Sequence, residues 1–393
     1  MRLGATGFAA LVAVAAVWAP AAHAQGAGAP RLVKELEIAD APGGLTAIGP
    51  VLVSRAGDVY VTQAQDNVVL QFDSTGRFVR KIGRKGQGPG ETEHLSNVGF
   101  VGDTLWTYDW MTGRFSLFSP SGAFYSAFRP PAIVDSTNAK RRTSTGANDL
   151  LANGAVYYAS HSFASYIEFD LLGPLTEFVA TRDGARIATV AAETNVGRTS
   201  FGFAVGNGQA FSGDGALGSM IDVNPRVAVG AGGAWLAVAE QSQCGARPRY
   251  MVSRLSPRGD TLWHATVACP NVPVPCGFLD SVVAFDRDKA VKIWKIAPSY
   301  AESQVRGKIG EVKEFAVLRE LKAGRDGSIW IRPFAISPEP QVWVRADARA
   351  GAPESFTLPP RTSLKLIVDS SHIWAVVSDA DDVQTLVRYR IER

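Results

Sequence analysis

The chain has 393 residues, of which 46% are hydrophobic and 20% are charged, and its formal net charge is +3. This composition excludes an intrinsically disordered or fibrous protein, because there are enough apolar side chains to form a core. The longest basic run is Lys140–Arg142, so the chain lacks the basic stripe that neutralises phosphates, and we expect no nucleic-acid partner.

The first segment predicts an export signal. Arg2 precedes an apolar run over residues 8–18, and Ala22–Ala24 has the small residues of a cleavage site. We expect cleavage after Ala24, followed by a linker over residues 25–30 and export to the periplasm or the outside of the cell. The apolar run is too short to cross a bilayer and no later segment is long and apolar enough, so no membrane span is expected.

Six segments share a tight turn followed by a strand with an aromatic residue three positions after the turn begins. The aromatic residues are Tyr60, Trp106, Tyr157, Trp235, Trp330 and Trp374. An apolar stretch precedes each turn and a second turn usually follows, so each repeat predicts two β-hairpins. Four-stranded units in tandem are the blades of a β-propeller, whereas a sandwich or barrel explains neither the six copies nor their order. We therefore predict an all-β, six-bladed propeller with four-stranded antiparallel blades.

The propeller domain is expected to span residues 31–393 and to be monomeric. Its blades are predicted near residues 44–83, 95–128, 149–191, 225–269, 313–358 and 363–393. The sixth repeat has three strands, while an alternating strand, Leu32–Ile38, precedes the first blade. Unpaired strands would expose sheet edges. We therefore expect residues 31–38 to pair with the strand at Gln384–Tyr389 and to complete the last blade.

The stretch Asp66–Gly76, followed by Gly83 and the Gly-Gln-Gly-Pro-Gly-Glu loop at Gly86–Glu91, resembles the repeat of NHL-type propellers. It is most similar to bacterial exported six-bladed propellers with that loop, and the close match covers roughly one blade. Members of this superfamily include binding scaffolds, lactonases and lyases. The resemblance therefore implies the fold and leaves recognition and catalysis both open. Within the fold, we interpret the loop as a tight passage between two blades.

Strand order within a blade, written a to d from the axis outwards, determines where the connections lie. The a–b and c–d turns lie on one face, the short-turn face, and the other connections lie on the opposite, long-loop face. The long connections all belong to the latter: residues 84–95, 129–148, 160–174, 192–224, 241–249 and 270–312. One helix is predicted, over Leu279–Ala297 and ended by Pro298. We interpret it as packed on the blades, with a lid over the channel as the alternative.

Recognition residues usually lie on loops that a rigid scaffold holds. We therefore expect a non-catalytic propeller that binds a protein partner or a small anionic ligand through the long-loop face, without a cofactor. The candidate ligand-binding residues are basic residues of this face: Arg84, Lys85, His94, Lys140, Arg141, Arg142, His161 and Arg249. Acidic residues such as Glu91 and Asp286 lie in the same loops, so charge alone does not decide the ligand.

The alternative is a metal-dependent hydrolase or lyase, similar to the lactonases, with a site in the axial channel that could hold Ca²⁺. The candidate ligands are polar residues near the starts of a strands: Asn97, Asp149, Asn224 and Glu320. Their offsets from the turns differ, which favours solvated or capping groups. No Gly-x-Ser-x-Gly elbow is present, and we assign no catalytic residue.

Three cysteines, Cys244, Cys269 and Cys276, leave at least one thiol outside any internal disulfide. We expect one disulfide, either Cys244–Cys269 or Cys269–Cys276, because both pairs lie within the fourth blade region.

Overall fold

The computed structural model describes residues 30–131, 133–134, 144–160, 175–193, 200–204, 210–214, 226–242, 249–268, 273–274, 277–309, 318–333, 340–346 and 354–393. The export signal, the linker before residue 30 and the three cysteines lie outside these residues. Signal cleavage and the disulfide therefore stay predictions. Among the described residues, no helix is long and apolar enough to cross a membrane.

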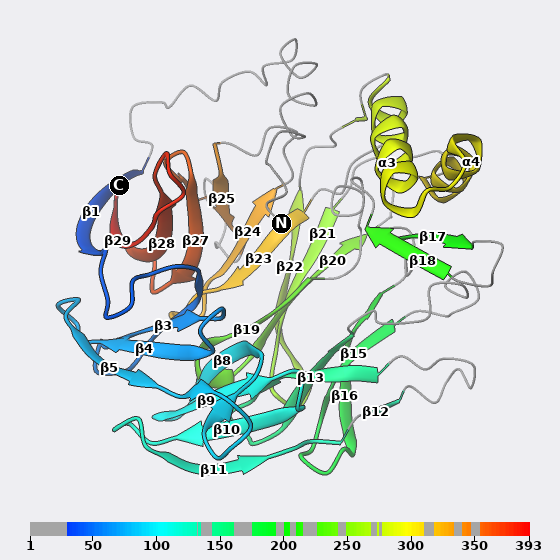
Figure 1. Cartoon of the computed structure of the whole chain (residues 1–393). Helices are drawn as coiled ribbons and strands as arrows, with labels where there is room; N and C mark the ends of the chain where they lie inside the picture. The colour runs from blue at the N-terminus through cyan, green and yellow to red at the C-terminus, as the bar shows by residue number, and fades with distance from the viewer. Residues whose placement is uncertain are drawn as a thin grey trace.

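Six antiparallel sheets are arranged around an axis, as Figure 1 shows; each has the four strands of a blade, and that of blade 3 has one short strand more. From the inside outwards, blade 1 contains β2 (Ile48–Val53), β3 (Val59–Gln63), β4 (Val68–Phe72) and β5 (Phe78–Ile82). Blade 2 contains β8 (Leu95–Val101), β9 (Thr104–Asp109), β10 (Arg114–Phe118) and β11 (Phe124–Phe128). Blade 3 contains β13 (Ser144–Leu150), β14 (Val156–Ser160), β15 (Leu175–Ala180) and β16 (Arg186–Glu193), with the short β12 (Ile133–Val134) beside β13.

The second half of the ring repeats this order. Blade 4 contains β19 (Arg226–Val229), β20 (Leu236–Ser242), β21 (Arg249–Leu255) and β22 (Thr261–Ala268). Blade 5 contains β23 (Leu318–Ala323), β24 (Ile329–Pro333), β25 (Val342–Arg345) and β26 (Ser355–Thr357). Blade 6 contains β27 (Thr362–Ile367), β28 (His372–Ser378), β29 (Gln384–Glu392) and, outermost, β1 (Arg31–Ile38). The predicted six-bladed fold is therefore confirmed.

The core consists of hydrophobic clusters that each join two neighbouring blades, including one between blade 6 and blade 1. Middle strands such as β3 and β4 are buried at every residue, because other blades cover both faces of their sheet. The six aromatic residues that mark the repeats are each at most 4% exposed and belong to these clusters. The aromatic residue that recurs in the sequence is thus the one that packs each blade against a neighbouring blade.

The N-terminal strand closes the ring as predicted. β1 pairs antiparallel with β29, from Arg31 opposite Glu392 to Ile38 opposite Leu386, and the two lie side by side in Figure 1. β29 extends to Glu392, beyond the predicted end of the strand at Tyr389.

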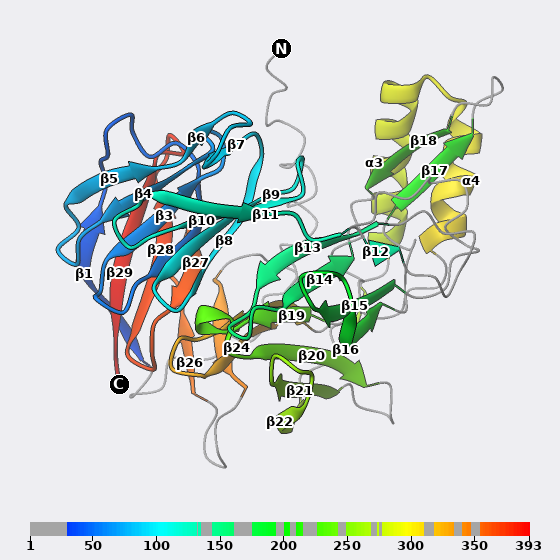
Figure 2. The same ribbon diagram turned by 90° about the horizontal axis from the view of Figure 1, so that it is seen from below.

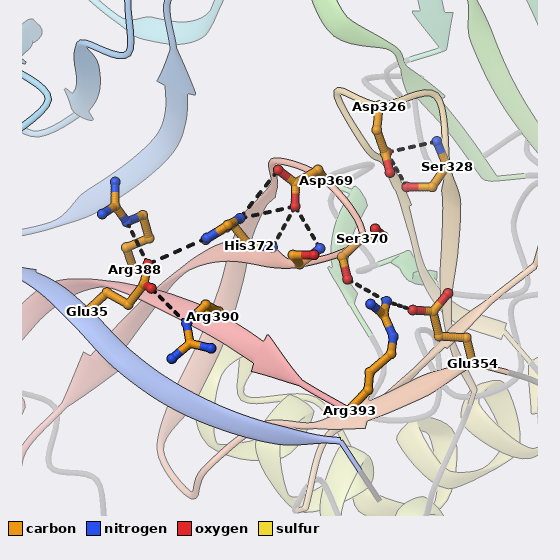
Figure 3. A network of polar contacts seen from close by, with 11 residues as sticks. Glu35, Asp326, Ser328, Glu354, Asp369, Ser370, His372, Arg388, Arg390 and Arg393 are labelled. Carbon is orange, nitrogen blue, oxygen red and sulfur yellow. Dashed lines mark hydrogen bonds and ion pairs between the residues drawn. The ribbon is translucent and has the colours of Figure 1, made fainter.

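A charged contact also joins β1 to blade 6. The register shifts between Lys34 and Leu36, so Glu35 is the extra residue of a β-bulge. Figure 3 shows its carboxylate among three basic side chains of blade 6. Its oxygens lie 2.9 Å from Nε of Arg390, 3.4 Å from Nε of Arg388 and 3.6 Å from Nε2 of His372. The bulge thus turns the Glu35 carboxylate toward basic side chains of the blade that β1 completes.

The insertion after blade 4 holds two helices, α3 (Phe278–Trp294) and α4 (Pro298–Ile309), so the prediction of a single helix is wrong in number. Pro298 was expected to end a helix. Instead it begins α4, because proline fits the first turn, where the backbone N–H has no helical acceptor. Arg287 of α3 and Glu302 of α4 form an ion pair at 3.3 Å. α4 also contacts β17 (Ser200–Ala204) of the β17–β18 (Ala210–Asp214) hairpin.

The additions to the blades lie on the same side of the molecule. Figure 2 shows β17, β18, α3 and α4 rising on the side that also carries β6 (Arg84–Lys85) and β7 (Glu91–Thr92). All of them belong to connections from the outermost strand of one blade to the innermost strand of the next. This side is the long-loop face.

Candidate functional site

The Gly86–Glu91 loop passes from blade 1 to blade 2 and is held by its own polar groups. The Glu91 carboxylate accepts a hydrogen bond from the N–H of Gly88 at 2.9 Å and forms an ion pair with Arg84. The two interactions, that with Gly88 being the larger, lower the pKa of Glu91. Gly86 has φ 148°, and a Cβ there would lie 2.2 Å from the Glu91 carboxylate. The carboxylate position thus requires glycine at residue 86.

A cavity of about 300 Å³ opens on the long-loop face of blade 1. It lies between the connection from β1 to β2 and the outer strands of the blade. Its floor is apolar, formed by Val68 and Leu70, which are 4% and 1% exposed. The remaining lining residues are Pro42, Gly43, Gln63, Asp66, Lys81, Arg84 and Lys85. Two residues predicted to bind a ligand, Arg84 and Lys85, therefore line one cavity.

The rim of the cavity is positively charged, with Lys81, Arg84 and Lys85 against Asp66. Arg84 is bound to Glu91. Among the described residues, Lys81 and Lys85 make no hydrogen bond or ion pair, so both ammonium groups are available to an anion.

One wall of the cavity is fixed by hydrogen bonds of Gln63. Its amide oxygen accepts from the N–H of Thr46 at 3.1 Å, and its amide nitrogen donates to the carbonyl of Gly44 at 2.7 Å. The wall is thus held in place without a ligand, which limits the cost of ordering it on binding.

His94 lies apart from this cavity, in an exposed patch of the same face. Its ring lies 5.5 Å from that of Trp110, which is 46% exposed, and Met111 beside it is 54% exposed. The Asp109 carboxylate joins the two segments, because it accepts the N–H of Glu93 at 2.8 Å and that of Met111 at 3.0 Å. An imidazole, an indole and a thioether thus form an exposed surface that the charge pattern of the sequence did not predict.

The innermost strands form the wall of the axial channel, and neighbours such as β2 and β8, β8 and β13, β23 and β27, and β27 and β2 contact one another. Five of these strands carry a β-bulge against the second strand of their blade. The bulges lie at Gly49–Pro50 in β2, Ser96 in β8, Asn148 in β13, Arg319 in β23 and Lys365 in β27. Bulges re-aim side chains and are frequent next to functional sites.

On one side of the channel, amide and carboxyl groups of blades 2 and 3 form a chain. The side-chain amide of Asn97 donates to the carbonyl of Asn148 at 3.0 Å and to its side-chain oxygen. Asn148 in turn donates to the carboxylate of Asp149 at 3.3 Å. Asp149 keeps some solvent contact, but burial raises its pKa to about 7. Two of the predicted metal ligands, Asn97 and Asp149, are thus linked through a third residue.

The third metal candidate, Glu320, lies in blade 5 and forms an ion pair with Arg332. Lys322 and Lys365 are its other charged neighbours. These cations oppose the binding of a metal ion at Glu320. Among the residues that the structure describes, no three His, Cys, Asp or Glu side chains are grouped to hold a metal. Asn224 lies outside those residues, so its predicted role is untested.

The other predicted ligand-binding residues are not brought to the cavity by any described contact. Lys140, Arg141, Arg142 and His161 lie outside the described residues. Arg249 begins β21, where it is paired with Ser242 and Ala268, and its side chain is not described.

Comparisons with known proteins support the fold. Residues 45–96 match a family model described as a 6-bladed beta-propeller, DUF5128. A Bacteroides fragilis NCTC 9343 protein described as exported has a similar structure, with TM-score 0.50 and 11% identity over 93% of this chain and 96% of that one.

Two further solved structures are more distant. One is a DUF4221 family member from Bacteroides vulgatus ATCC 8482, with TM-score 0.42 and 8% identity over 93% and 99% of the two chains. The other is virginiamycin B lyase from Staphylococcus aureus, with TM-score 0.41 and 10% identity over 92% and 98%. No curated protein sequence matches the chain. At such identities a shared structure shows the fold alone. The chain is a mainly β, six-bladed propeller whose N-terminal strand completes the last blade.

Proposed function

We propose that the protein is an exported, non-catalytic propeller that recognises an anionic group, on a small ligand or a protein partner, through its long-loop face. The observation that carries this proposal is the blade 1 cavity, with its apolar floor and with Lys81 and Lys85 at its rim, which have no partner in the part of the chain that the structure describes. The cavity volume lies at the lower end of the range of small-molecule sites. The ligand class that fits is an organic anion with an apolar body.

Catalysis by a metal in the channel is the less well supported alternative. Glu320 is bound by Arg332, and the lysines next to it favour an anion over a cation. Asp149 accepts a hydrogen bond from Asn148 and has a raised pKa. A carboxyl that holds its proton near neutral pH is a poor metal ligand, because metal binding requires the deprotonated form.

The experiment is a panel of aliphatic and aromatic carboxylates, scored by thermal unfolding at constant ionic strength. We expect at least one carboxylate to raise the unfolding temperature of the native protein. The variant Lys81→Glu/Lys85→Glu should bind it at least about tenfold more weakly, because a hydrogen bond to a charged group contributes about 1.5–3 kcal/mol.

The matched control is Arg55→Glu/Arg77→Glu, which makes the same change of charge at two exposed arginines of the short-turn face. Equal loss of binding in this control would contradict the assignment of faces. Export is tested separately, by mass spectrometry of the mature protein, for which we expect Gln25 as the first residue.

A further inference from the structure

The axial channel contains a cluster of cations that the proposed function does not use. It begins on β23, where Leu321 and Ala323 pack into the hydrophobic cluster between blades 4 and 5. Since side chains alternate along a strand, Glu320 and Lys322 point to the opposite face of the sheet, toward blade 6. Trp330, which is paired with Lys322, lies in the cluster between blades 5 and 6. Lys322 therefore lies between these two blades at their inner edge.

A second lysine reaches the same place from the next blade. Lys365 is the extra residue of the bulge in β27, between Leu364 and Leu366. Its ammonium group donates to the backbone carbonyl of Ile48 in β2 at 2.7 Å. The bulge thus directs Lys365 across the inner edge of the ring, from blade 6 to blade 1. The cluster spans the inner strands of three blades.

The charges of this cluster do not balance. Arg332 forms an ion pair with Glu320, which leaves Lys322 and Lys365 as further cations beside the same carboxylate. Within the described part of the chain, three basic side chains, Lys322, Arg332 and Lys365, thus lie around the Glu320 carboxylate. Among the described residues, the Lys322 ammonium group has no hydrogen bond or ion pair.

Solvent reaches the cluster even though protein surrounds it. Lys322 and Lys365 are half-buried, and the side chain of Glu320 is 40% exposed. Burial lowers the pKa of Lys322, and burial followed by the charge of Lys322 lowers the pKa of Lys365. These groups thus keep solvent contact while the surrounding protein disfavours the charged forms of the two lysines. Asp149 of blade 3, on the other side of the ring, is in the same condition.

We propose that Lys322 and Lys365 form a binding site for a small oxyanion, a carboxylate or a phosphate, in the axial channel between blades 5, 6 and 1. An ammonium group that is desolvated and has no hydrogen-bond acceptor lowers the stability of the folded protein. A bound oxyanion would supply that acceptor. Sites that reduce stability are commonly retained for function. The oxyanion binds on the blade 5 and 6 side, away from Asp149. This site is separate from the blade 1 cavity.

The test is Lys322→Met, which keeps most of the side-chain volume and removes the charge. The probes are succinate and inorganic phosphate, titrated by calorimetry at constant ionic strength. We expect the native protein to bind at least one of them and Lys322→Met to bind it about tenfold more weakly, since a charge-assisted hydrogen bond is lost. We also expect Lys322→Met to unfold at a higher temperature than the native protein without ligand, because an uncompensated charge is removed.

Two controls separate this site from the rest of the molecule. Lys292→Met removes an exposed lysine of α3 and should change neither affinity nor stability. Lys81→Glu/Lys85→Glu, in the blade 1 cavity, should leave unchanged the affinity for phosphate, which is not a member of the carboxylate panel, so each site can fail alone. Binding of only one probe identifies the chemistry of the oxyanion. The proposal is overturned if neither probe binds the native protein, or if Lys322→Met binds as tightly as the native protein.

Discussion

Ile38 offers a direct test of how the ring is closed, and we predict that Ile38→Ala strongly destabilises the propeller. Ile38 is the last residue of β1, is 2% exposed and lies in the cluster that joins blades 6 and 1, together with Trp374 and Leu386. The change removes three carbon atoms, each of which contributes about 0.8 kcal/mol when buried. The space left between the blades adds a further loss. We therefore expect the free energy of unfolding to fall by about 3–4 kcal/mol.

Equilibrium unfolding in urea, followed by tryptophan fluorescence, measures this change. The matched control is Leu262→Ala in β22, the outermost strand of blade 4, because Leu262 is 57% exposed. Its loss should stay within about 0.5 kcal/mol. Deletion of residues 31–38 should cost more than Ile38→Ala, because it also exposes the edge of β29.

The reasoning is refuted if Ile38→Ala loses less than about 1 kcal/mol, which is well below the loss expected for a buried isoleucine. Unchanged thermal unfolding of the deletion variant would refute it equally. Either result would mean that β1 does not hold the first and last blades together in solution.

Three further predictions concern single residues. Glu35→Gln should lower the free energy of unfolding, measured in urea, by about 1 kcal/mol, as expected for a partly exposed ion pair. This loss should shrink in 1 M salt, and a loss that does not depend on salt would contradict an ionic contact. Gly86→Ala should lower the unfolding temperature, because the new Cβ displaces the Glu91 carboxylate, whereas Gly102→Ala, where nothing lies within 4 Å, isolates the cost of positive φ alone. Asp149→Asn tests the raised pKa of about 7. Between about pH 4 and 7 the folded native protein keeps a proton on Asp149 that the unfolded chain has lost, so the stability of the native protein falls as pH rises. The variant should therefore gain stability relative to the native protein from pH 4 to pH 8, and a difference in urea unfolding that stays constant with pH would contradict the shift.

The propeller could be predicted from the sequence because its determinants are local. A hairpin turn followed by a buried aromatic residue recurs in each blade, as in Trp330 and Trp374, which are 0% and 2% exposed. The strand pattern also predicted closure, since the strand at residues 31–38 and the three-stranded last repeat each lacked a partner. The second helix of the insertion could not be predicted, because a proline can either end a helix or begin one.

The channel lining could not be predicted, and the reason is the bulges. One extra residue, such as Asn148 or Lys365, reverses the side to which the rest of the strand points, and no residue type marks its position. The bulges also lie at different depths, which explains why Asn97, Asp149 and Glu320 have different offsets from their turns. The sequences of β23 and β27 do not distinguish Lys322 and Lys365 from other polar strand residues.

The blade 1 cavity could be predicted in part. Arg84 and Lys85 were identified because they lie in a long loop. Lys81 was not, because it lies on a regularly alternating outer strand. Pro42 and Gly43 come from the connection after β1, and the closure of the ring brings this connection to the cavity.

The closing strand also determines the order in which the molecule can be completed. Among the described strands, β1 is synthesised before all the others and β29 after them, and the ion pair between Glu35 and Arg390 spans 355 positions of the chain. Joining the ends of so long a segment costs roughly 5 kcal/mol of chain entropy, which is recovered only when the whole ring is present. The early blades can assemble on one another during synthesis, but the final sheet must wait. Until then β1 is an open strand edge that another chain could occupy, so products of premature termination should be especially prone to aggregation.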